Sequence, residues 1–252
     1  MKALILAAGY ATRLYPLTQS IAKPLLTIGG RPMVEHILER IREADPLEVH
    51  LVTNSKFASA FSEWAPADVI VHDDGTTSES DRLGAIGDLR FVVERAGIDE
   101  DWLVVAGDNL FDYSLGEYVR WWRSKGVASA VALFEHPELE LVKQYGVVEL
   151  DEHERVVSFV EKPPEPASNL AATACYLFHR EHLKLVATYL DEGNLPDQPG
   201  RFVEWLHRRA PVYGYRFSGA WLDIGDRAQL LEADNRARTQ AGLSPRAEYA
   251  PG

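Results

Sequence analysis

The sequence predicts an α/β protein with a doubly wound, mostly parallel sheet. Short apolar runs, typical of strands buried on both faces, alternate with segments whose apolar residues recur at helical spacing. The first such run is 3–7, Ala-Leu-Ile-Leu-Ala, and a loop of small residues follows it directly. Alternating strands and helices favour parallel strands joined by right-handed crossovers. From residue 136 onward short strands come in pairs instead, which predicts an antiparallel region inserted into this sheet.

Apolar patterning places the elements along the chain. A helix is predicted over about 32–44, because Met33, Ile37 and Ile41 recur at helical spacing after a glycine turn signal. Residues 72–87 form a polar loop that runs into a second helix. Further strands are expected at 48–53, 68–72, 102–106, 128–134 and 212–217, further helices at 55–64, 114–125, 179–190 and 201–209, and a hairpin from 145–150 and 155–160.

Length and composition limit the class of protein. At 252 residues the chain can bury a full core and fits one α/β domain with insertions. Its net charge of −12 argues against a nucleic-acid partner, because phosphate backbones are held by basic surfaces. The single cysteine, Cys175, excludes an internal disulfide and a cysteine-rich metal site. The N-terminal apolar run is shorter than that of a secretory signal, and no stretch has the length of a membrane span. We therefore expect a cytoplasmic protein with no membrane partner, and the sequence leaves a homo-oligomer open.

The most informative stretch is 6–18, Leu-Ala-Ala-Gly-Tyr-Ala-Thr-Arg-Leu-Tyr-Pro-Leu-Thr, with Lys23-Pro24 behind it. Backbone amides of a loop at the carboxyl end of a first parallel strand can point at phosphate oxygens, while Arg13 and Lys23 supply neutralising charge. The stretch contains neither a P-loop motif nor the Gly-x-Gly-x-x-Gly fingerprint, so neither a P-loop ATPase nor an ordinary dinucleotide oxidoreductase is indicated. A nucleotide ligand is therefore predicted.

This stretch resembles the signature of the sugar-phosphate nucleotidyltransferases (NDP-sugar pyrophosphorylases), Leu-Ala-Ala-Gly-x-Gly-Thr-Arg-Leu-x-Pro-x-Thr followed by Lys-Pro. The chain looks like their glucose-1-phosphate thymidylyltransferase and uridylyltransferase catalytic domains. Ala11 stands at the family's second glycine, which costs roughly 1 kcal/mol if the position requires positive φ. The resemblance implies a Rossmann-like nucleotidyltransferase fold and one nearly minimal catalytic domain over 1–252. Within it we expect a nucleotide-binding part at about 1–135, an antiparallel sugar-binding part at about 136–225 and a C-terminal helix at about 226–240.

Two aspartates are candidate ligands of Mg²⁺. Asp108 follows the buried strand 102–106 in Gly-Asp-Asn, where its carboxylate faces the same sheet edge as the first loop. Asp223 lies in Trp-Leu-Asp-Ile-Gly, which resembles the family's Trp-x-Asp-x-Gly, whose aspartate is the partner ligand. The resemblance also implies nucleotide contacts by Leu6, Ala8, Gly9, Tyr10, Ala11, Thr12, Arg13, Lys23 and Gly84. The family's glutamine and proline before Gly84 are missing, so the choice among dTTP, UTP, CTP and GTP stays open.

The resemblance places a sugar site at the end of the predicted hairpin. In the family, Glu-Lys-Pro sets the glutamate on sugar hydroxyls and the lysine on the sugar phosphate, and Glu161-Lys162-Pro163 matches it. Residues 168–176 are similar to the family's Asn-x-x-x-Thr-Gly-x-Tyr strand, with Ala174 at the glycine. Sugar-phosphate contacts are thereby implied for Asn109, Gly146, Glu161, Lys162, Asn169 and Thr173.

The implied reaction joins a sugar 1-phosphate to the α-phosphorus of a nucleoside triphosphate, with release of pyrophosphate and with Arg13, Lys23 and Lys162 as the catalytic cations. A hexose 1-phosphate with dTTP or UTP is the leading expectation. Two alternatives remain: a nucleotidyltransferase for a non-sugar phosphate such as phosphocholine, and a non-catalytic pyrophosphorylase-like regulatory subunit. The retained charges argue against the subunit, and the Glu161-Lys162 and Asn169 matches favour sugar. The histidines show no paired spacing of zinc ligands, which argues against a zinc hydrolase.

Overall fold

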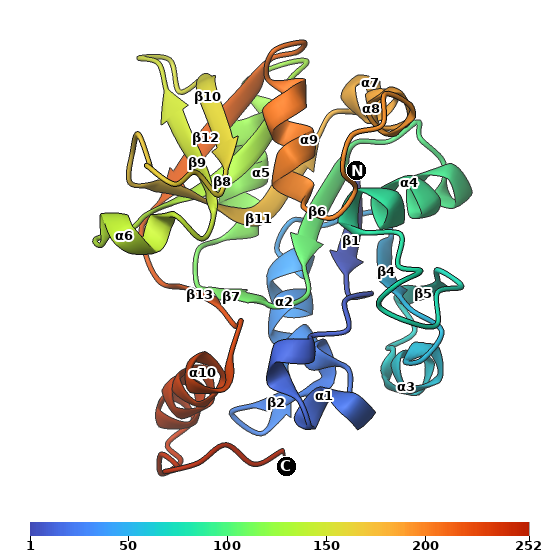
Figure 1. Ribbon diagram of the computed structural model, residues 1–252, viewed down its shortest axis with the longest axis vertical. Coiled ribbons are helices and arrows are strands. Elements are labelled where there is room, and N and C mark those ends of the chain that lie inside the picture. Colours follow the sequence, from blue (N-terminus) through green and yellow to red (C-terminus); the bar gives the residue numbers. More distant parts are fainter. Residues whose placement is uncertain (252) are drawn as a thin grey trace.

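Within residues 1–251, which the computed structural model describes, nine strands form one mixed sheet (Figure 1). They are β1 (Lys2–Leu6), β4 (Val49–Thr53), β5 (Val69–Asp73), β6 (Trp102–Ala106), β8 (Ser129–Glu135), β9 (Gly146–Leu150), β10 (Val156–Glu161), β11 (Leu170–Phe178) and β12 (Val212–Phe217). Their order is β10-β9-β11-β6-β1-β4-β5, and β8 pairs with β11 and β12. The neighbours β5, β4, β1 and β6 are parallel, whereas β11 runs antiparallel to β6, β8 and β9. The predicted parallel sheet with an antiparallel insertion is therefore confirmed.

The order of the parallel strands creates a crevice between β1 and β6. The chain passes from β1 outward to β4 and β5 and then returns to β6 on the other side of β1. Ligands of such sheets bind beyond the carboxyl ends of the strands, at the point where the strand order reverses. The loops that leave β1 and β6 therefore lie side by side at the position where this fold type binds ligands.

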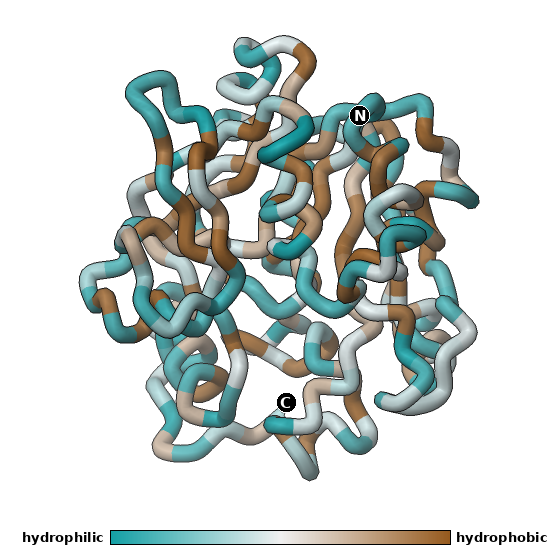
Figure 2. The backbone as a smooth tube through the Cα atoms, turned by 45° about the horizontal axis from the view of Figure 1, so that its top comes forward, coloured by the Kyte–Doolittle hydropathy of each residue, from teal (hydrophilic) through white to brown (hydrophobic). Residues whose placement is uncertain are grey.

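Helices cover both faces of the sheet, as a doubly wound fold requires (Figure 1). On one face lie α2 (Met33–Arg42), α3 (Ala58–Trp64) and α5 (Leu115–Arg123), and on the other α4 (Ala85–Ala96), α8 (Leu185–Asp191) and α9 (Pro199–Leu206). Alternate residues of β1 serve the two cores: Ile5 packs with α2 and α5, and Leu4 packs with α4. Figure 2 shows apolar residues concentrated along the strands and polar residues in the outer loops. None of the helices within the described 1–251 has the length and apolar character needed to cross a bilayer.

Short elements outside the sheet complete the carboxyl end. Strand β7 (Asn109–Phe111) pairs antiparallel with β13 (Trp221–Asp223), and β2 (Thr27–Ile28) forms a hairpin with β3 (Arg31–Pro32). Helix α10 (Arg227–Gln240) begins at a capping box made by Asp226 and Gln229, as predicted for 226–240, and packs on the β2 hairpin. The remaining short helices are the 3₁₀ turns η1 (Thr12–Leu14) and η2 (Lys23–Leu25) and the α-helices α1 (Leu17–Ser20), α6 (Leu139–Val142) and α7 (Arg180–Leu183). The helix predicted at 179–190 is thus two short helices, α7 and α8.

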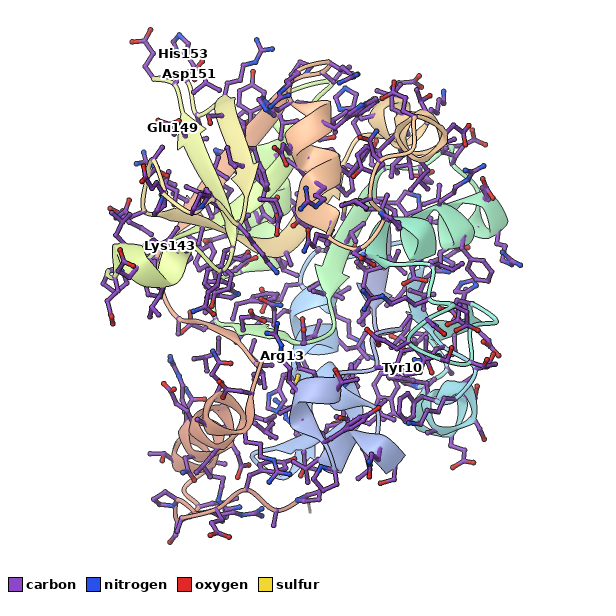
Figure 3. All side chains as sticks on the ribbon, in the orientation of Figure 1. Tyr10, Arg13, Lys143, Glu149, Asp151 and His153 are labelled. Atoms are coloured by element: carbon purple, nitrogen blue, oxygen red, sulfur yellow. The ribbon has the colours of Figure 1, made fainter. Side chains whose placement is uncertain are left out.

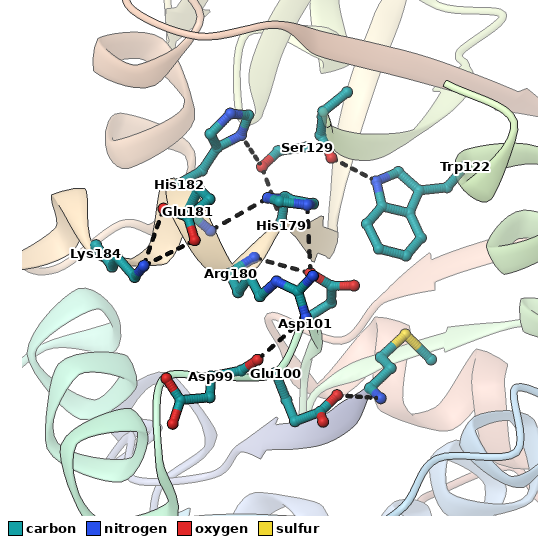
Figure 4. A network of polar contacts seen from close by, with 12 residues as sticks. Asp99, Glu100, Asp101, Trp122, Ser129, His179, Arg180, Glu181, His182 and Lys184 are labelled. Carbon is teal, nitrogen blue, oxygen red and sulfur yellow. Dashed lines mark hydrogen bonds and ion pairs between the residues drawn. The ribbon is translucent and has the colours of Figure 1, made fainter. Parts of the chain in front are cut away.

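A polar network closes the opposite, amino end of the sheet (Figure 4). Ser129 Oγ lies 2.9 Å from His182 Nδ1 and accepts the backbone N–H of His179 at 3.3 Å. Asp101, just before β6, accepts the backbone N–H of Arg180 at 2.9 Å. Because the Ser129 side chain is fully buried, this serine, histidine and aspartate set is no hydrolase site. It ties β8 and α7 to the start of β6.

A histidine pair between β4 and β5 makes stability sensitive to acid. His50 Nδ1 lies 2.9 Å from His72 Nε2, and His50 Nε2 lies 3.1 Å from Glu48 Oε2, so the three contacting nitrogens are satisfied when both rings are neutral. Burial lowers the pKa of His50, and burial together with the charge on His50 lowers the pKa of His72 to about 4. The unfolded chain therefore binds more protons than the folded chain below about pH 6.5.

We expect the contribution of this histidine pair to the free energy of unfolding to be constant above pH 7 and to fall as the pH drops from 6.5 toward 4. In His72→Gln the amide can still donate to His50, so this decline should be smaller. Urea unfolding at a series of pH values measures both slopes. Equal slopes in the variant and in the wild type would contradict the assignment to this pair.

Candidate functional site

A cavity of about 380 Å³ lies at the carboxyl ends of β1 and β6. Its walls come from the loops after these strands, the starts of α4, α9 and β9, the end of β10, the middle of β11, and β13. Most residues predicted for the site line it: Leu6, Ala8, Gly9, Ala11, Lys23, Gly84, Asp108, Asn109, Gly146, Glu161, Lys162, Thr173 and Asp223. The fold thus gathers residues of both predicted parts around one space.

The loop after β1 is fixed by its backbone. Ala7 N–H donates to the Val52 carbonyl at 2.9 Å, and Asn54 Nδ2 donates to the Ala8 carbonyl at 2.8 Å. Gly9 faces open space, since none of the described residues comes within 4 Å of the position of a Cβ there. Ala11 adopts left-handed backbone angles, with φ 49° and ψ 46°. Ala11 therefore has the positive φ at which an alanine side chain is strained.

Two alanines occupy positions that favour glycine. Ala11 has φ 49° and Ala174, in a bulge of β11, has φ 52°. We expect Ala11→Gly and Ala174→Gly each to raise the free energy of unfolding by about 1 kcal/mol, because glycine removes the clash of Cβ with the backbone. Chemical denaturation measures this gain. As a control, Ala65→Gly at φ −59° should lower stability instead, and an equal gain at Ala65 would refute the explanation.

Asp108 is the first carboxylate of the site and is already paired. The Cβ of an alanine at Gly107 would lie 2.8 Å from the Leu6 carbonyl oxygen, so glycine lets this turn lie close to β1. The two Asp108 oxygens accept from Lys23 Nζ and from Asn109 Nδ2, each at 2.8 Å. Burial alone raises the pKa of Asp108, but the charge of Lys23 and these hydrogen bonds outweigh it and hold the pKa below its usual value. Asp108 is therefore ionised at neutral pH.

Asp223 is brought beside Asp108 by the β7–β13 pair. Asp223 lies opposite Asn109 in the register, and Ile224 N–H donates to the Asp108 carbonyl at 3.2 Å. Trp221 Nε1 donates to Asn109 Oδ1 at 2.6 Å, so a side-chain hydrogen bond also holds β7 and β13 together. The two predicted metal-ligand positions thus share one wall of the cavity.

The second carboxylate has no full counter-charge. Burial and the negative charge of Asp108 raise the pKa of Asp223 to about 6, although Lys23, Lys162 and Arg13 act in the opposite direction. Two carboxylates that hinder each other's ionisation are suited to a divalent cation between them. Mg²⁺ is commonly held by one or two carboxylates and completes its shell with water and phosphate oxygens. Residues 1–251 contain no group of three or more histidines, cysteines or acids with metal-binding geometry.

Glu161 and Lys162 form the opposite wall. Glu161 pairs with Gly146 in the β9–β10 register, and Cβ atoms at Gly146 or Gly200 would lie 3.1 and 2.1 Å from Glu161 Oε2. The carboxyl therefore occupies a slot that only these two glycines leave open. Burial raises the pKa of Glu161, and the charges of Lys162 and Arg201 oppose that rise. Lys162 has φ 51°, a strained value for lysine that turns the chain at the cavity.

Not all of the predicted residues line the cavity. Asn169 Nδ2 donates to Glu135 Oε1 at 3.3 Å, outside the lining, whereas Thr173 in the β11 bulge lines it and donates to the Ala132 carbonyl at 3.1 Å. Figure 3 shows Tyr10 on the side of β5 and Arg13 on the side of the segment between β13 and α10. Tyr10 is buried beneath the loop, and Thr12 opens η1.

Arg13 lies outside the lining but acts on the site through its charge. It is exposed, and among residues 1–251 it forms no ion pair. Its positive charge nevertheless acts to lower the pKa of Asp223, against the rise caused by burial and by Asp108. An unpaired guanidinium beside this carboxylate wall is suited to a phosphate group at the mouth of the cavity.

Several lining residues were absent from the prediction. Arg82 Nη2 reaches Asp197 Oδ2 at 3.2 Å, which joins the loop before α4 to the loop before α9, and Asp88 and Gln198 line the same end. These residues come from polar loops or from one turn of a helix, so no motif marks them. At this end of the cavity only Gly84 was identified from the sequence. The structure shows why this residue is glycine: its φ is 76° and Pro196 lies close to the position of a Cβ.

Comparison with known proteins gives the following matches. Residues 2–240 match the model of a family described as nucleotidyl transferase. The chain is 31% identical over 242 residues to a UTP–glucose-1-phosphate uridylyltransferase of Synechocystis sp., covering 89% of this chain and 60% of that protein. It is 29% identical to a glucose-1-phosphate adenylyltransferase of Thermotoga neapolitana, covering 92% and 59%. The chain thus spans about three fifths of the length of these relatives. A crystal structure of UDP-glucose pyrophosphorylase with UDP-glucose has the same fold, with a TM-score of 0.81 at 22% identity over 95% of this chain and 98% of that one.

Proposed function

Because the chain belongs to the nucleotidyl transferase family, we propose that it transfers a nucleoside monophosphate from a nucleoside triphosphate to a sugar 1-phosphate. The products are an NDP-sugar and pyrophosphate. Family membership confirms the resemblance found in the amino-acid sequence. Two curated relatives are named as glucose-1-phosphate nucleotidyltransferases, which supports the sugar 1-phosphate as acceptor.

The observation that supports this reaction best is one cavity with two carboxylates and two lysines. Asp108 and Asp223 form one wall, Lys23 lies with them, and Lys162 enters from the end of β10. This set can hold two phosphate groups and one divalent cation at the same place. A phosphate monoester is already an anionic nucleophile, so the reaction requires alignment and charge neutralisation rather than a strong base.

In the proposed mechanism an oxygen of the sugar phosphate forms a bond to the α-phosphorus, and the bond from that phosphorus to the bridging oxygen breaks. Pyrophosphate leaves with the electron pair. Lys162 positions the attacking phosphate, Lys23 neutralises the α-phosphate, and Arg13 binds the departing pyrophosphate. These cations act strongly because the cavity walls have a lower dielectric than water.

Asp108 and Asp223 would hold Mg²⁺, which supplies positive charge against the phosphate oxygens when it is bound. In the structure Lys23 occupies one Asp108 oxygen, so this buried lysine keeps the Asp108 carboxylate paired before substrates arrive. Glu161, in its glycine-walled slot, accepts hydrogen bonds from sugar hydroxyls. A hexose 1-phosphate with dTTP or UTP is the leading pair of substrates, while the named relatives use different bases.

Pyrophosphate release with Mg²⁺ tests the proposal across a grid of nucleoside triphosphates and acceptors. The acceptors include several sugar 1-phosphates and phosphocholine, and Asp108→Asn serves as the inactive control. We expect release with one nucleotide and one or a few hexose 1-phosphates. Release only with phosphocholine, or nucleotide binding without any release, would overturn the assignment to sugar 1-phosphates.

A further inference from the structure

Some buried polar atoms of the described residues have no hydrogen-bond partner and lie at the carboxyl ends of β1, β4 and β5 and in the first turn of α4. They are Tyr10 Oη, Thr53 Oγ1, Asn54 Oδ1, Asp74 Oδ2 and Asp88 Oδ1, and of these side chains only Asp88 lines the cavity. Folded proteins leave few such atoms, and a group of them indicates a shared proton or a bound ligand. We call this group the α4 polar cluster.

Backbone hydrogen bonds hold the cluster together. Asp74 N–H donates to the Thr53 carbonyl at 2.9 Å, and Ser55 N–H donates to the Thr76 carbonyl at 2.9 Å. The backbone N–H and the hydroxyl of Thr76 both donate to Asp74 Oδ1 at 2.7 Å. One oxygen of Asp74 is thus doubly satisfied and the side chain cannot turn freely, while the other oxygen is left without a donor.

That remaining oxygen meets Asp88. Asp74 Oδ2 and Asp88 Oδ1 are both buried without a donor from any other described residue, and Asp74 raises the pKa of Asp88 both through its charge and as a hydrogen-bond partner. Two carboxyl oxygens in such a contact require one proton between them. Asp88 is 5% exposed, stands four residues after Gly84 in α4 and lines the cavity. Because Oδ1 is fully buried, Oδ2 is the oxygen left to face the cavity.

The charges around Asp88 favour the shared proton. Burial first, and then the charge of Asp74, raise the pKa of Asp88 to about 8, and no cation among residues 1–251 offsets them. From the loop after β1, Tyr10 stays uncharged because burial raises the pKa of its phenol. From the facing loops, Arg82 and Asp197 line the same end, and the charge of Arg82 is offset by ion pairs with both Asp197 and Glu79. The pair is therefore singly protonated at neutral pH.

We propose that Asp88 accepts a hydrogen bond from an N–H group of the nucleobase, and that Asp74 positions it by sharing one proton with it. The inference rests on the proposed function, because it takes the cavity to bind a nucleoside triphosphate. The cations Lys23 and Lys162 attract the phosphates to the wall of Asp108 and Asp223, which leaves the cation-poor end at α4 for the base. A base without an N–H group at this point would bind more weakly, because the fixed carboxyl oxygen would stay without a hydrogen-bond donor.

Equilibrium binding and kinetics of three variants test this role. With the preferred triphosphate we expect Asp88→Ala to raise both Kd and KM about 10- to 100-fold and to leave kcat within about threefold, because the contact is equal in ground and transition states. In Asp88→Asn the amide nitrogen can donate to Asp74 and its oxygen can face the base. Its Kd should therefore stay within about threefold of wild type.

The pH dependence separates this role from a structural one. Above pH 8 the wild-type pair loses its shared proton, the two carboxylates repel, and KM should rise. Asp88→Asn has no such proton, so the ratio of wild-type to variant KM should climb with pH, and this ratio cancels any titration of the nucleotide itself. Asp74→Asn, which removes the repelling charge, should also abolish the rise.

Several results would overturn the inference. Unchanged Kd and KM in Asp88→Ala for every nucleoside triphosphate would show that Asp88 does not contact the base. An Asp88→Asn variant as impaired as Asp88→Ala, with an unchanged thermal midpoint, would show that the shared-proton geometry is irrelevant. Failure of the wild type to bind any nucleoside triphosphate would instead overturn the proposed function and this inference together, so the two failures are distinguishable.

Discussion

Asp108→Asn is expected to lower kcat/KM for pyrophosphate release by about 10³-fold, since it removes one of the two carboxylates proposed to hold the metal. The side-chain shape and one acceptor oxygen remain, so the loss reports charge rather than packing. The Mg²⁺ concentration needed for half-maximal activity should rise in the same variant. Asp68→Asn, at an exposed ion pair with Arg42, is the matched control and should change kcat/KM less than twofold.

A loss of less than tenfold in Asp108→Asn would contradict the proposed role. Stability needs a separate readout, because the variant leaves the nearly buried Lys23 without its carboxylate. Adding Lys23→Met to Asp108→Asn removes that unpaired charge. We expect the double variant to recover thermal stability without recovering turnover, which separates the two effects.

Arg13→Ala should lower kcat/KM by about 10²-fold, because it removes the side chain proposed to bind the leaving pyrophosphate. In the reverse reaction the KM for pyrophosphate should rise. The thermal midpoint should not change, because Arg13 is exposed and has no ion-pair partner within residues 1–251. Few active-site substitutions are expected to leave stability so unaffected.

Two companions make this experiment specific. Arg13→Lys keeps the charge but loses the planar fork, so its activity should lie between the wild type and Arg13→Ala. Arg42→Ala removes an exposed arginine far from the cavity and should leave kinetics unchanged. A normal pyrophosphate KM in Arg13→Ala would rule out the proposed contact with the leaving group.

The parallel half of the fold was accessible from the sequence because its signals are local. The run 3–7 is apolar at every position, and β1 is buried on both faces. The helix predicted at 32–44 is found as α2 at Met33–Arg42. It could be predicted because the helical spacing of its apolar residues is visible in the sequence. By contrast, the predicted helix at 179–190 is two helices, a break that no glycine or proline marks in the sequence.

The sequence predicts a site residue where that residue lies in a recognisable motif. It does not predict a residue whose role arises only from a tertiary contact. Asp108 and Asp223 each stand in a recognisable motif, but the β7–β13 ladder that joins them has only three residues a side and no pattern of its own. Asp88 is a single acid on an amphipathic helix. Only the arrival of Asp74 from β5 turns it into half of a proton-sharing pair, and such a contact has no signature along the chain.

The β7–β13 ladder also has a consequence for synthesis. Asp108 leaves the ribosome with the first half of the chain, whereas Asp223 follows only after the strands β8 to β12. A nascent chain therefore carries the Asp108–Lys23 half of the site long before its second acidic wall exists. Incomplete chains lack the paired acids on which we expect activity to depend. The order of translation thus delays completion of the proposed metal site until the molecule is nearly assembled.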